Sequence, residues 1–457
     1  MAAGHGFPDT FGLPALRGRV HDGTVKEATV PRVLPSTAVW SALGACLCAG
    51  ALACGSDESG GEEGPVVVGS DVPANAVSEP AASGAPSPAV DGLLAGEPAL
   101  GGSCTPRLGA ETFTSAVCSC EGTSVAGYLK TDAFASANPG GAVANPAAGL
   151  APGSVSVNGD YATAGYANVF GSFTVAGDRS IAFGGFLRAG EDVRVNPSLD
   201  VAGVVDVGRD AFLRRDARVF GRVDIARDLY LGTGAALNGI AIVDVGGERR
   251  SEAVSIEAPC ACGADRVIDV SALVDAAEAD NDNARAGLDQ DALNVVVGIG
   301  AEATLAAGRY FIHQLGGLGS LTLHVTGKVA LFVGDDVIAA GAFRVELEPD
   351  AELDLFVRDN LVITGAALFG DPERPSATRI YVGGTGDVAI AGVSAFVGNL
   401  YAPRANILVG GLGQARGALF GKNVIAAGFL DLGYDASIRD AGDGCPPLEP
   451  ADIPRIR

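Results

Sequence analysis

Five aspartates recur at a regular spacing, and they are the strongest candidates for chemistry in this chain. Asp160, Asp178, Asp192, Asp210 and Asp228 follow one another at intervals of 18, 14, 18 and 18 residues. Carboxylates stacked in a repeating fold repel one another unless a cation or an arginine neutralises them, and calcium prefers oxygen ligands of this kind. The series is therefore a candidate calcium site, although the calcium-binding nonapeptide repeat is absent.

The alternative for these aspartates is structural, and we favour it. Aspartate suits tight turns because its side chain hydrogen-bonds to nearby backbone. Arginines close by in the sequence could neutralise the carboxylates, namely Arg179, Arg209, Arg215 and Arg227. We therefore expect no metal or other cofactor, with calcium as the alternative.

Cysteines form the second candidate set. Six lie beyond the N-terminal apolar region: Cys104, Cys118, Cys120, Cys260, Cys262 and Cys445. An even number in an exported chain predicts up to three disulfides, whose connectivity does not follow from the sequence. Cys104 and Cys445 flank the folded region, so one bridge between them would tie its ends. The two Cys-x-Cys pairs could instead bind metal, but zinc sites favour a longer spacer, and no histidine lies beside them.

Motifs of enzymes are missing from the chain. His313 and His324 are the histidines beyond the N-terminal region, and His324 lies in an alternating segment typical of a strand. The nucleophile elbow, the zinc-protease helix motif and the phosphate-binding loop are absent. We therefore predict that the protein is not an enzyme. A carbohydrate-active enzyme is the alternative, and it needs two carboxylates close together in a groove.

Glycines mark a repeat that must position these residues. Each aspartate lies seven residues after a glycine, and the glycines expected at the corners are Gly153, Gly171, Gly185, Gly203, Gly221 and Gly239. Between corners, apolar residues alternate with polar ones, as in the pairs Val205 and Val207 or Val223 and Ile225. A period of two indicates short strands with one buried face.

Short strands at a fixed period near 18 residues predict a solenoid. We expect an all-β fold, a single-stranded parallel, right-handed β-helix, over residues 151–440, with its inward side chains stacked in ladders. Looser repeats continue it in the second half, for example "LFVGDDVIAAG" and "LFVRDNLVITG". One lateral or capping α-helix is predicted near residues 270–285, with Ser271 as N-cap. Its buried face would hold Ala272, Leu273, Ala276 and Ala277.

The first hundred residues predict export. Residues 33–54, "VLPSTAVWSALGACLCAGALAC", form an apolar run after Arg32 and end in cysteine. A basic flank, an apolar run and a small-residue exit define a signal peptide. The exit is similar to a bacterial lipobox, which makes Cys54 the expected lipidated residue and Cys46 the alternative. A transmembrane anchor is a further alternative for this run.

Composition divides the rest of the chain. Residues 1–54 form an upstream extension and the signal, and residues 55–103, rich in glycine, alanine, proline and serine, form a disordered tether. Residues 104–150 are expected to form an N-terminal cap, and residues 441–457 a tail. The net charge of -23 argues against nucleic acid as a partner, because phosphate binding needs a basic surface.

Several segments resemble a known but uncharacterised family. They are "PCACGADRVIDVSALVDAAEADNDN", "LFVRDNLVITG", "NLYAPRANILVGG" and "ALFGKNVIAAG". Over roughly residues 150–440 the chain resembles bacterial envelope domains of unknown function with a right-handed β-helix. It is also similar to choice-of-anchor adhesin-type domains and to bactofilins, which polymerise. The resemblance implies a surface role and supplies no catalytic residues.

These observations predict an exported, lipid-anchored protein of the cell envelope, at the outer membrane or the cell surface. Its β-helix is expected to be structural, adhesive or ligand-binding. The expected partners are the membrane, through the lipid, and a polysaccharide, another envelope protein or a second copy of the chain. A bactofilin-like self-assembling polymer is the remaining alternative.

Overall fold

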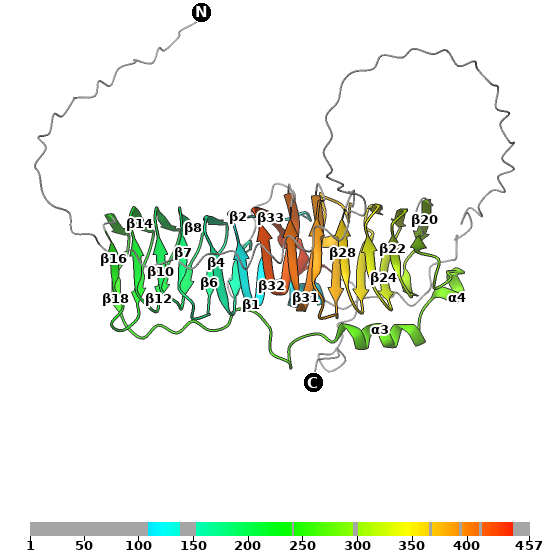
Figure 1. Cartoon of the computed structure of the whole chain (residues 1–457), viewed down its shortest axis with the longest axis horizontal. Helices are drawn as coiled ribbons and strands as arrows, with labels where there is room; N and C mark the ends of the chain where they lie inside the picture. The colour runs from blue at the N-terminus through cyan, green and yellow to red at the C-terminus, as the bar shows by residue number, and fades with distance from the viewer. Residues whose placement is uncertain are drawn as a thin grey trace, which may run out of the picture. The chain divides into compact units, whose positions relative to one another are not determined.

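The computed structural model describes residues 108–137, 152–239, 242–295, 300–364, 368–392, 395–410 and 414–441 (Figure 1). The chain divides into two units, Met1–Gly84 and Ala85–Arg457, and all described residues belong to the second. The predicted signal, lipidation site and tether lie outside the described residues, and so do Cys46, Cys54, Cys104 and Cys445. No helix among the described residues has the length and apolar character to cross a membrane.

Four groups of elements build the described part of this unit. We call residues 108–137 the junction coil; it holds α2 (Leu108–Thr112), β1 (Val117–Val125) and β2 (Tyr128–Phe134). The first arm, residues 152–251, contains β3 (Val155–Val157), β4 (Asp160–Thr163), β5 (Tyr166–Val169), β6 (Phe173–Val175), β7 (Ile181–Phe183), β8 (Leu187–Ala189), β9 (Val193–Val195), β10 (Leu199–Val201), β11 (Val205–Val207), β12 (Ala211–Leu213), β13 (Ala217–Val219), β14 (Arg222–Ile225), β15 (Leu229–Leu231), β16 (Leu237–Gly239), β17 (Ile242–Val245) and β18 (Arg249–Ser251).

A connecting segment and the second arm follow. The connection contains α3 (Val270–Ala279) and α4 (Asn283–Ala286). The second arm, residues 294–435, contains β19 (Asn294–Val295), β20 (Gly300–Leu305), β21 (Gly308–Ile312), β22 (Leu315–Gly317), β23 (Ser320–Val325), β24 (Lys328–Val333), β25 (Val337–Ala339), β26 (Ala342–Leu347), β27 (Glu352–Val357), β28 (Leu361–Thr364), η1 (Pro375–Ala377), β29 (Thr378–Val382), β30 (Val388–Ala391), β31 (Ala395–Gly410), β32 (Gln414–Ala427) and β33 (Phe429–Asp435), before η2 (Ala436–Arg439).

The strands stack as the coils of one parallel β-solenoid, which confirms the predicted fold class. Along one side, which we call face 1, the strands pair in the order β21, β24, β27, β29, β31, β32, β1, β3, β6, β9, β12, β15 and β18, always in parallel. Val205 and Val207 are buried in the core, and so are Val223 and Ile225. The alternating pattern therefore identified the inward residues.

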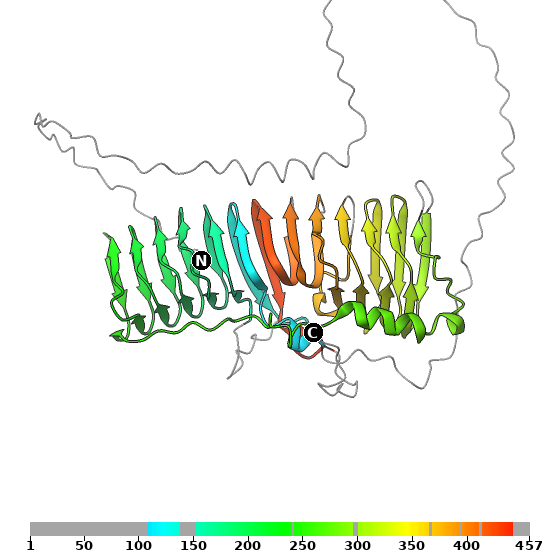
Figure 2. The same cartoon turned by 60° about the horizontal axis from the view of Figure 1, so that its bottom comes forward.

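The junction coil lies in the middle of this stack and not at an end. β1 pairs with β32 on one side and with β3 and β4 on the other, while β2 pairs with β33 and with β5. In Figures 1 and 2 the first strands lie between the two arms. The prediction that residues 104–150 cap an end is therefore wrong for the described part, because both edges of this coil pair with strands of neighbouring coils.

The last coil is fixed to the first by a buried carboxylate. Asp435 is fully buried, and its Oδ1 accepts hydrogen bonds from the Ser136 amide at 2.9 Å and the Ser437 amide at 3.1 Å. Its Oδ2 accepts from the Ser136 hydroxyl at 2.6 Å and from the Ser376 amide at 3.0 Å. Buried carboxylates need such partners, so Asp435 locks the two ends of the described chain together.

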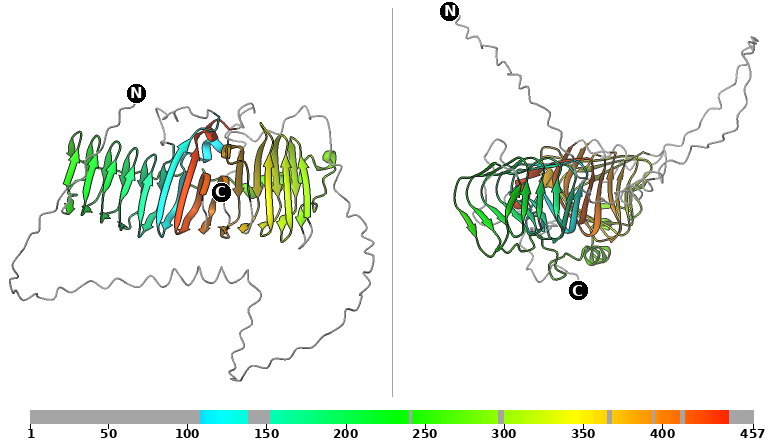
Figure 3. Two further views of the ribbon diagram at one scale, coloured as in Figure 1. Left: turned by 90° about the horizontal axis from the view of Figure 1, so that it is seen from above. Right: turned by 60° about the vertical axis from the view of Figure 1, so that its left-hand side comes forward.

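A long connection must then carry the chain between the two outer ends. We call residues 252–268 the strap; it runs beside the first arm and leads into α3, which lies along face 1 of the second arm (Figures 2 and 3). Ser251 lies on β18, and Cys260 lies beside Asn158, just after β3. Five coil steps separate these strands, about 24 Å at ~4.8 Å per step, and the nine residues between them reach about 30 Å when extended. The strap is therefore nearly taut.

The predicted helix forms, but its details differ. α3 has Asp269 as N-cap and not Ser271; the Asp269 carboxylate accepts a hydrogen bond from the Ala272 amide at 3.1 Å. Its buried residues are Val270, Val274 and Ala277. Of the predicted buried face, only Ala277 is fully covered, because the stripe that meets the solenoid follows Val270, Val274 and Ala277 at spacings of four and three residues.

Both outer ends carry features that protect open strand edges. In the last coil of the first arm, Arg249 and Ser251 are in register with buried Leu229 and partly buried Leu231, and Arg249 donates to the Val243 carbonyl at 3.0 Å. At the other end, the Asn283 side chain accepts from the Phe311 amide at 2.9 Å, and Asp282 accepts from the Arg309 amide at 2.8 Å. Inward charges and side-chain hydrogen bonds both discourage edge-to-edge association.

Candidate functional site

An outward column of side chains on face 1 forms the surface on which the strap and α3 lie. In the second arm its members are aromatic and stacked in register: Phe311, Phe332, Phe356, Tyr381, Tyr401 and Phe420. All six are buried although they point away from the solenoid core. The next member, on β1, is Cys118. The column is therefore the docking surface of the connecting segment, and it ends at a covalent bond.

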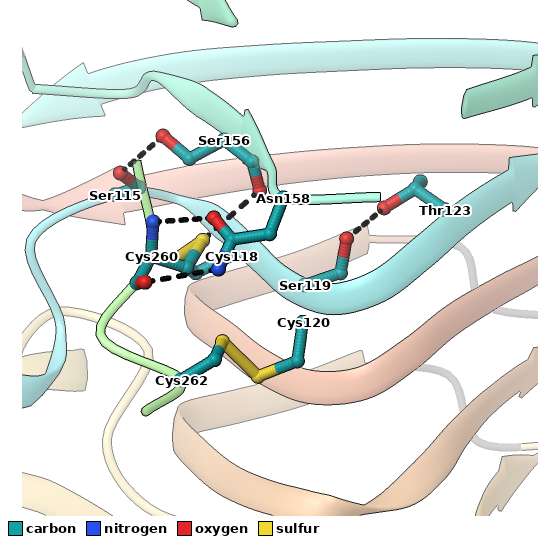
Figure 4. The surroundings of a disulfide bond; sticks show 9 residues. All are labelled: Ser115, Cys118, Ser119, Cys120, Thr123, Ser156, Asn158, Cys260 and Cys262. Carbon is teal, nitrogen blue, oxygen red and sulfur yellow. Dashed lines mark hydrogen bonds between the residues drawn. A yellow bond between two sulfur atoms is a disulfide. The ribbon is translucent and has the colours of Figure 1, made fainter. Parts of the chain in front are cut away.

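Two disulfides bind the strap to the junction coil. Cys118 pairs with Cys260 and Cys120 with Cys262, each across 142 residues (Figure 4). Asn158 reinforces this attachment. Its side chain accepts a hydrogen bond from the Cys260 amide at 2.7 Å and donates one to the Cys260 carbonyl at 3.0 Å. The two Cys-x-Cys pairs therefore serve each other as disulfide partners, as the cysteine count predicted, and not as metal ligands.

A cavity of about 340 Å³ opens between α2 and the strap, close to the disulfides. Its floor is formed by Tyr401 and Phe420, and its rim includes Glu111, Asp265 and Arg266. The Tyr401 hydroxyl accepts a hydrogen bond from the Ile268 amide at 3.0 Å, which fixes the floor to the strap. Glycoside hydrolysis needs two carboxylates in one groove, and Glu111 and Asp265 both line this cavity. Neither carboxylate was singled out in the sequence, because they approach only after the strap has docked.

The aspartate series divides between two corners of the solenoid. Asp192, Asp210 and Asp228 immediately precede β9, β12 and β15 on face 1. Asp160 begins β4 and Asp178 precedes β7, at the next corner. The interval of 14 residues marks this change of corner. The expectation of one stack of five carboxylates is therefore wrong.

Within the larger group, each carboxylate accepts a backbone hydrogen bond from the following coil. Asp192 Oδ1 accepts from the Asp210 amide at 3.2 Å, Asp210 Oδ1 from the Asp228 amide at 3.0 Å, and Asp228 Oδ1 from the Glu248 amide at 2.8 Å. Ser154 and Ser172 begin the same ladder in the earlier coils, because their hydroxyl oxygens accept from the Ser172 and Asp192 amides. The side chains thus hold successive corners together.

Arginines neutralise this ladder. Arg194 lies 2.9 Å from Asp192, Arg227 lies 3.4 Å from Asp210, and Arg250 lies 3.7 Å from Asp228. The hydrogen bond from the Glu248 amide, helped by Tyr230 and Arg250, holds the pKa of Asp228 below its usual value. At the other corner, Asp178 pairs with Arg215 at 2.5 Å and accepts from Asn196.

These contacts account for the aspartates without a cation. Among the described residues, no group of three or more histidine, cysteine and acidic side chains is arranged to hold a metal ion. Calcium at the aspartates stays a prediction that the geometry does not require. The turn role and the arginine pairing agree with the structural interpretation.

The corner glycines also belong to different corners. Gly185, Gly203 and Gly221 stack at one corner, where a Cβ on Gly203 would lie 2.5 Å from the carbonyl oxygen of Gly185. Gly153 and Gly171 precede β3 and β6 at another corner, and Gly239 ends β16. The sequence indicated one corner for all six glycines. That prediction holds for Gly185, Gly203 and Gly221 and is wrong for the other three.

The two histidines lie at the surface of the second arm. His324 on β23 lies between Glu302, at 2.9 Å, and Glu346, at 3.1 Å, which belong to the neighbouring coils. His313 lies 2.9 Å from Asp291. His324 thus occupies the alternating strand that the sequence predicted, with a carboxylate on each side.

A buried ion pair beneath α2 was missed in the sequence. Arg379 contacts Asp354 through two hydrogen bonds, at 2.5 and 2.9 Å, and Glu352 at 2.8 Å. Burial raises the pKa of Glu352, but the charge and hydrogen bond of Arg379, together with Lys328, hold it below its usual value overall. Two acidic residues at alternate positions of one strand, Glu352 and Asp354, were the available signal. The buried charges of Arg379 and Asp354 and the partly buried charge of Glu352 are therefore paired with one another.

Comparisons with known proteins agree with part of the resemblance. A family model described as a domain of unknown function, DUF7305, matches residues 248–441. That span begins in the last coil of the first arm and includes the strap, α3 and the second arm. No curated protein and no solved structure matches the chain.

The two disulfides should stabilise the fold in a strongly non-additive way. Both join the same two segments, so either one closes the 142-residue loop. Removing both, by Cys→Ala substitution at all four positions, should cost about 4–5 kcal/mol of unfolding free energy from loop entropy. Removing one pair should cost a small fraction of that. Urea denaturation of the variant without both pairs and of the two variants without one pair checks this. Losses from the two single-pair variants that add up to the loss from the double removal would contradict it.

The aspartate ladder should depend on its acceptor atom and not on calcium. Asp210→Ala leaves the Asp228 amide without its acceptor and should cost about 1–3 kcal/mol, while Asp210→Asn keeps an oxygen and should cost less. Asp206→Ala is the exposed control and should change stability by less than about 0.5 kcal/mol. A chelator should leave the urea midpoint unchanged; a midpoint that falls on chelation and recovers with calcium would restore the metal interpretation.

Proposed function

We propose that this chain is an exported, lipid-anchored protein of the cell envelope whose β-solenoid is a rigid, non-catalytic binding module. The observation that carries the proposal is the pair of disulfides at the centre of the fold. Disulfides persist in oxidising compartments, and here they fix the segment that joins the two arms. The lipobox-like exit at Cys54 and the tether of residues 55–103 support attachment to a membrane.

A binding module is favoured over a polymer by the two outer ends. Head-to-tail assembly needs strand edges that accept another coil at both ends. Arg249 and Ser251 at inward positions, and Asn283 on the edge of β21, weigh against such stacking. The sides of the solenoid are then the surfaces available to a partner.

A carbohydrate-active enzyme is the second candidate. The cavity with Glu111 and Asp265 above Tyr401 and Phe420 favours it. Against it, the floor is almost completely buried, with Tyr401 3% and Phe420 2% exposed, so a sugar ring has little surface to contact. We therefore place binding before catalysis.

Lipid labelling of the full chain in a bacterial host tests the proposal. The wild type should incorporate a fatty-acid analogue and remain in the membrane fraction, because the expected Cys54 thiol carries the lipid. Cys54→Ala should lose both properties, while Cys46→Ala, the matched control, should keep them.

Retention of label by Cys54→Ala, or recovery of the wild type in the cytoplasm, would overturn the anchoring. Incubation of the purified protein with polysaccharides should release no new reducing ends. Their release by the wild type, and its loss in Glu111→Gln, would establish the enzyme instead.

A further inference from the structure

A second aromatic column lies on the solenoid surface away from the strap. Phe429, Tyr128 and Tyr166 are in register on β33, β2 and β5, and Phe186, next to β8, continues the column. Ring centroids are 6.3 Å apart between Phe429 and Tyr128 and between Tyr128 and Tyr166, and 5.1 Å apart between Tyr166 and Phe186. The column therefore crosses the junction coil over four consecutive coils.

Unlike the column beneath the strap, this one is open to solvent. Phe429 is 71% exposed and Tyr166 is 45% exposed, while Tyr128 and Phe186 are half-buried. Aromatic residues make up only 6% of the chain, so four on one exposed line are a concentrated apolar surface. Exposed clusters of this kind mark interaction sites.

A polar column borders the rings. Lys130, Asn168 and Arg188 are in register beside Tyr128, Tyr166 and Phe186. Lys130 is paired with Asp132 at 2.5 Å and Asp431 at 3.3 Å, and the Arg188 guanidinium lies 4.8 Å above the Phe186 ring. The border therefore offers hydrogen-bond donors with little net positive charge.

We propose that this column, Phe429, Tyr128, Tyr166 and Phe186, binds an uncharged polysaccharide strand that lies along the solenoid axis. The inference rests on the proposed binding role. Sugar rings present C–H faces that stack on aromatic rings and hydroxyls that bond to neighbouring donors. Glycans also repeat at a length similar to the coil rise of ~4.8 Å.

Charge selects an uncharged ligand over an acidic one. The chain carries a net charge of -23, which repels polyanions. Lys130 is neutralised by its aspartates, and Arg188 lies 3.9 Å from Asp206. The four rings span three coil steps, about 14 Å, which suits a short stretch of a glycan chain.

Titration of the purified full chain with cellohexaose and with chitohexaose tests the site, using calorimetry. The wild type should bind at least one of them. Phe429→Ala and Tyr166→Ala should each weaken binding by about tenfold, as expected for exposed aromatic contacts at a binding surface. Phe220→Ala is the matched control, because Phe220 is 49% exposed and lies outside the column. Its affinity should stay within about twofold of wild type.

Three results would overturn the inference: no binding of either glycan by the folded wild type, equal loss in Phe220→Ala, or unchanged binding in both column variants. Phe429 is mostly exposed, so its variant should fold even if Tyr166→Ala does not. A column variant that instead dissociates an oligomer in analytical ultracentrifugation would identify a second copy of the chain as the occupant. Loss of lipid labelling or export would refute the proposed function without touching this site.

Discussion

The pairing of the junction coil on both of its edges is the constraint on which the rest of the fold depends. Because β1 and β2 are flanked by β32 and β33 on one side and by β3, β4 and β5 on the other, the first described strands become interior. The chain must then leave along one arm and return to the far end of the other. The strap, its disulfides and α3 are consequences of that order.

The strap also explains why the two surfaces of the solenoid differ. Where it and α3 lie on face 1, six aromatic rings are buried outside the core, and they bind the connection to the second arm. On the surface that neither the strap nor α3 covers, the rings of Tyr166 and Phe429 are exposed. The same residue type thus serves docking within the chain on one surface and offers a binding surface on the other.

The sequence was sufficient to predict the parallel solenoid, the inward residues of the first arm and the presence of a helix. Alternation within each strand is local, so Val205 and Val207 could be identified without knowing their neighbours. The order of the coils could not be read, because a coil has the same local pattern wherever it stacks. For the same reason the cysteine pairing and the cavity beside Glu111 were hidden. The five aspartates were identified, but the one interval of 14 residues places Asp160 and Asp178 at a different corner from Asp192, Asp210 and Asp228.

Hydrogen exchange of the backbone amides tests the position of the junction coil most directly. Strands paired on both edges exchange slowly, while terminal coils fray. If β1 and β2 are interior, their amides should exchange as slowly as those of β6 and β32, and more slowly than those of β17 and β18. Exchange in β1 and β2 as fast as in β17 and β18 would contradict the account.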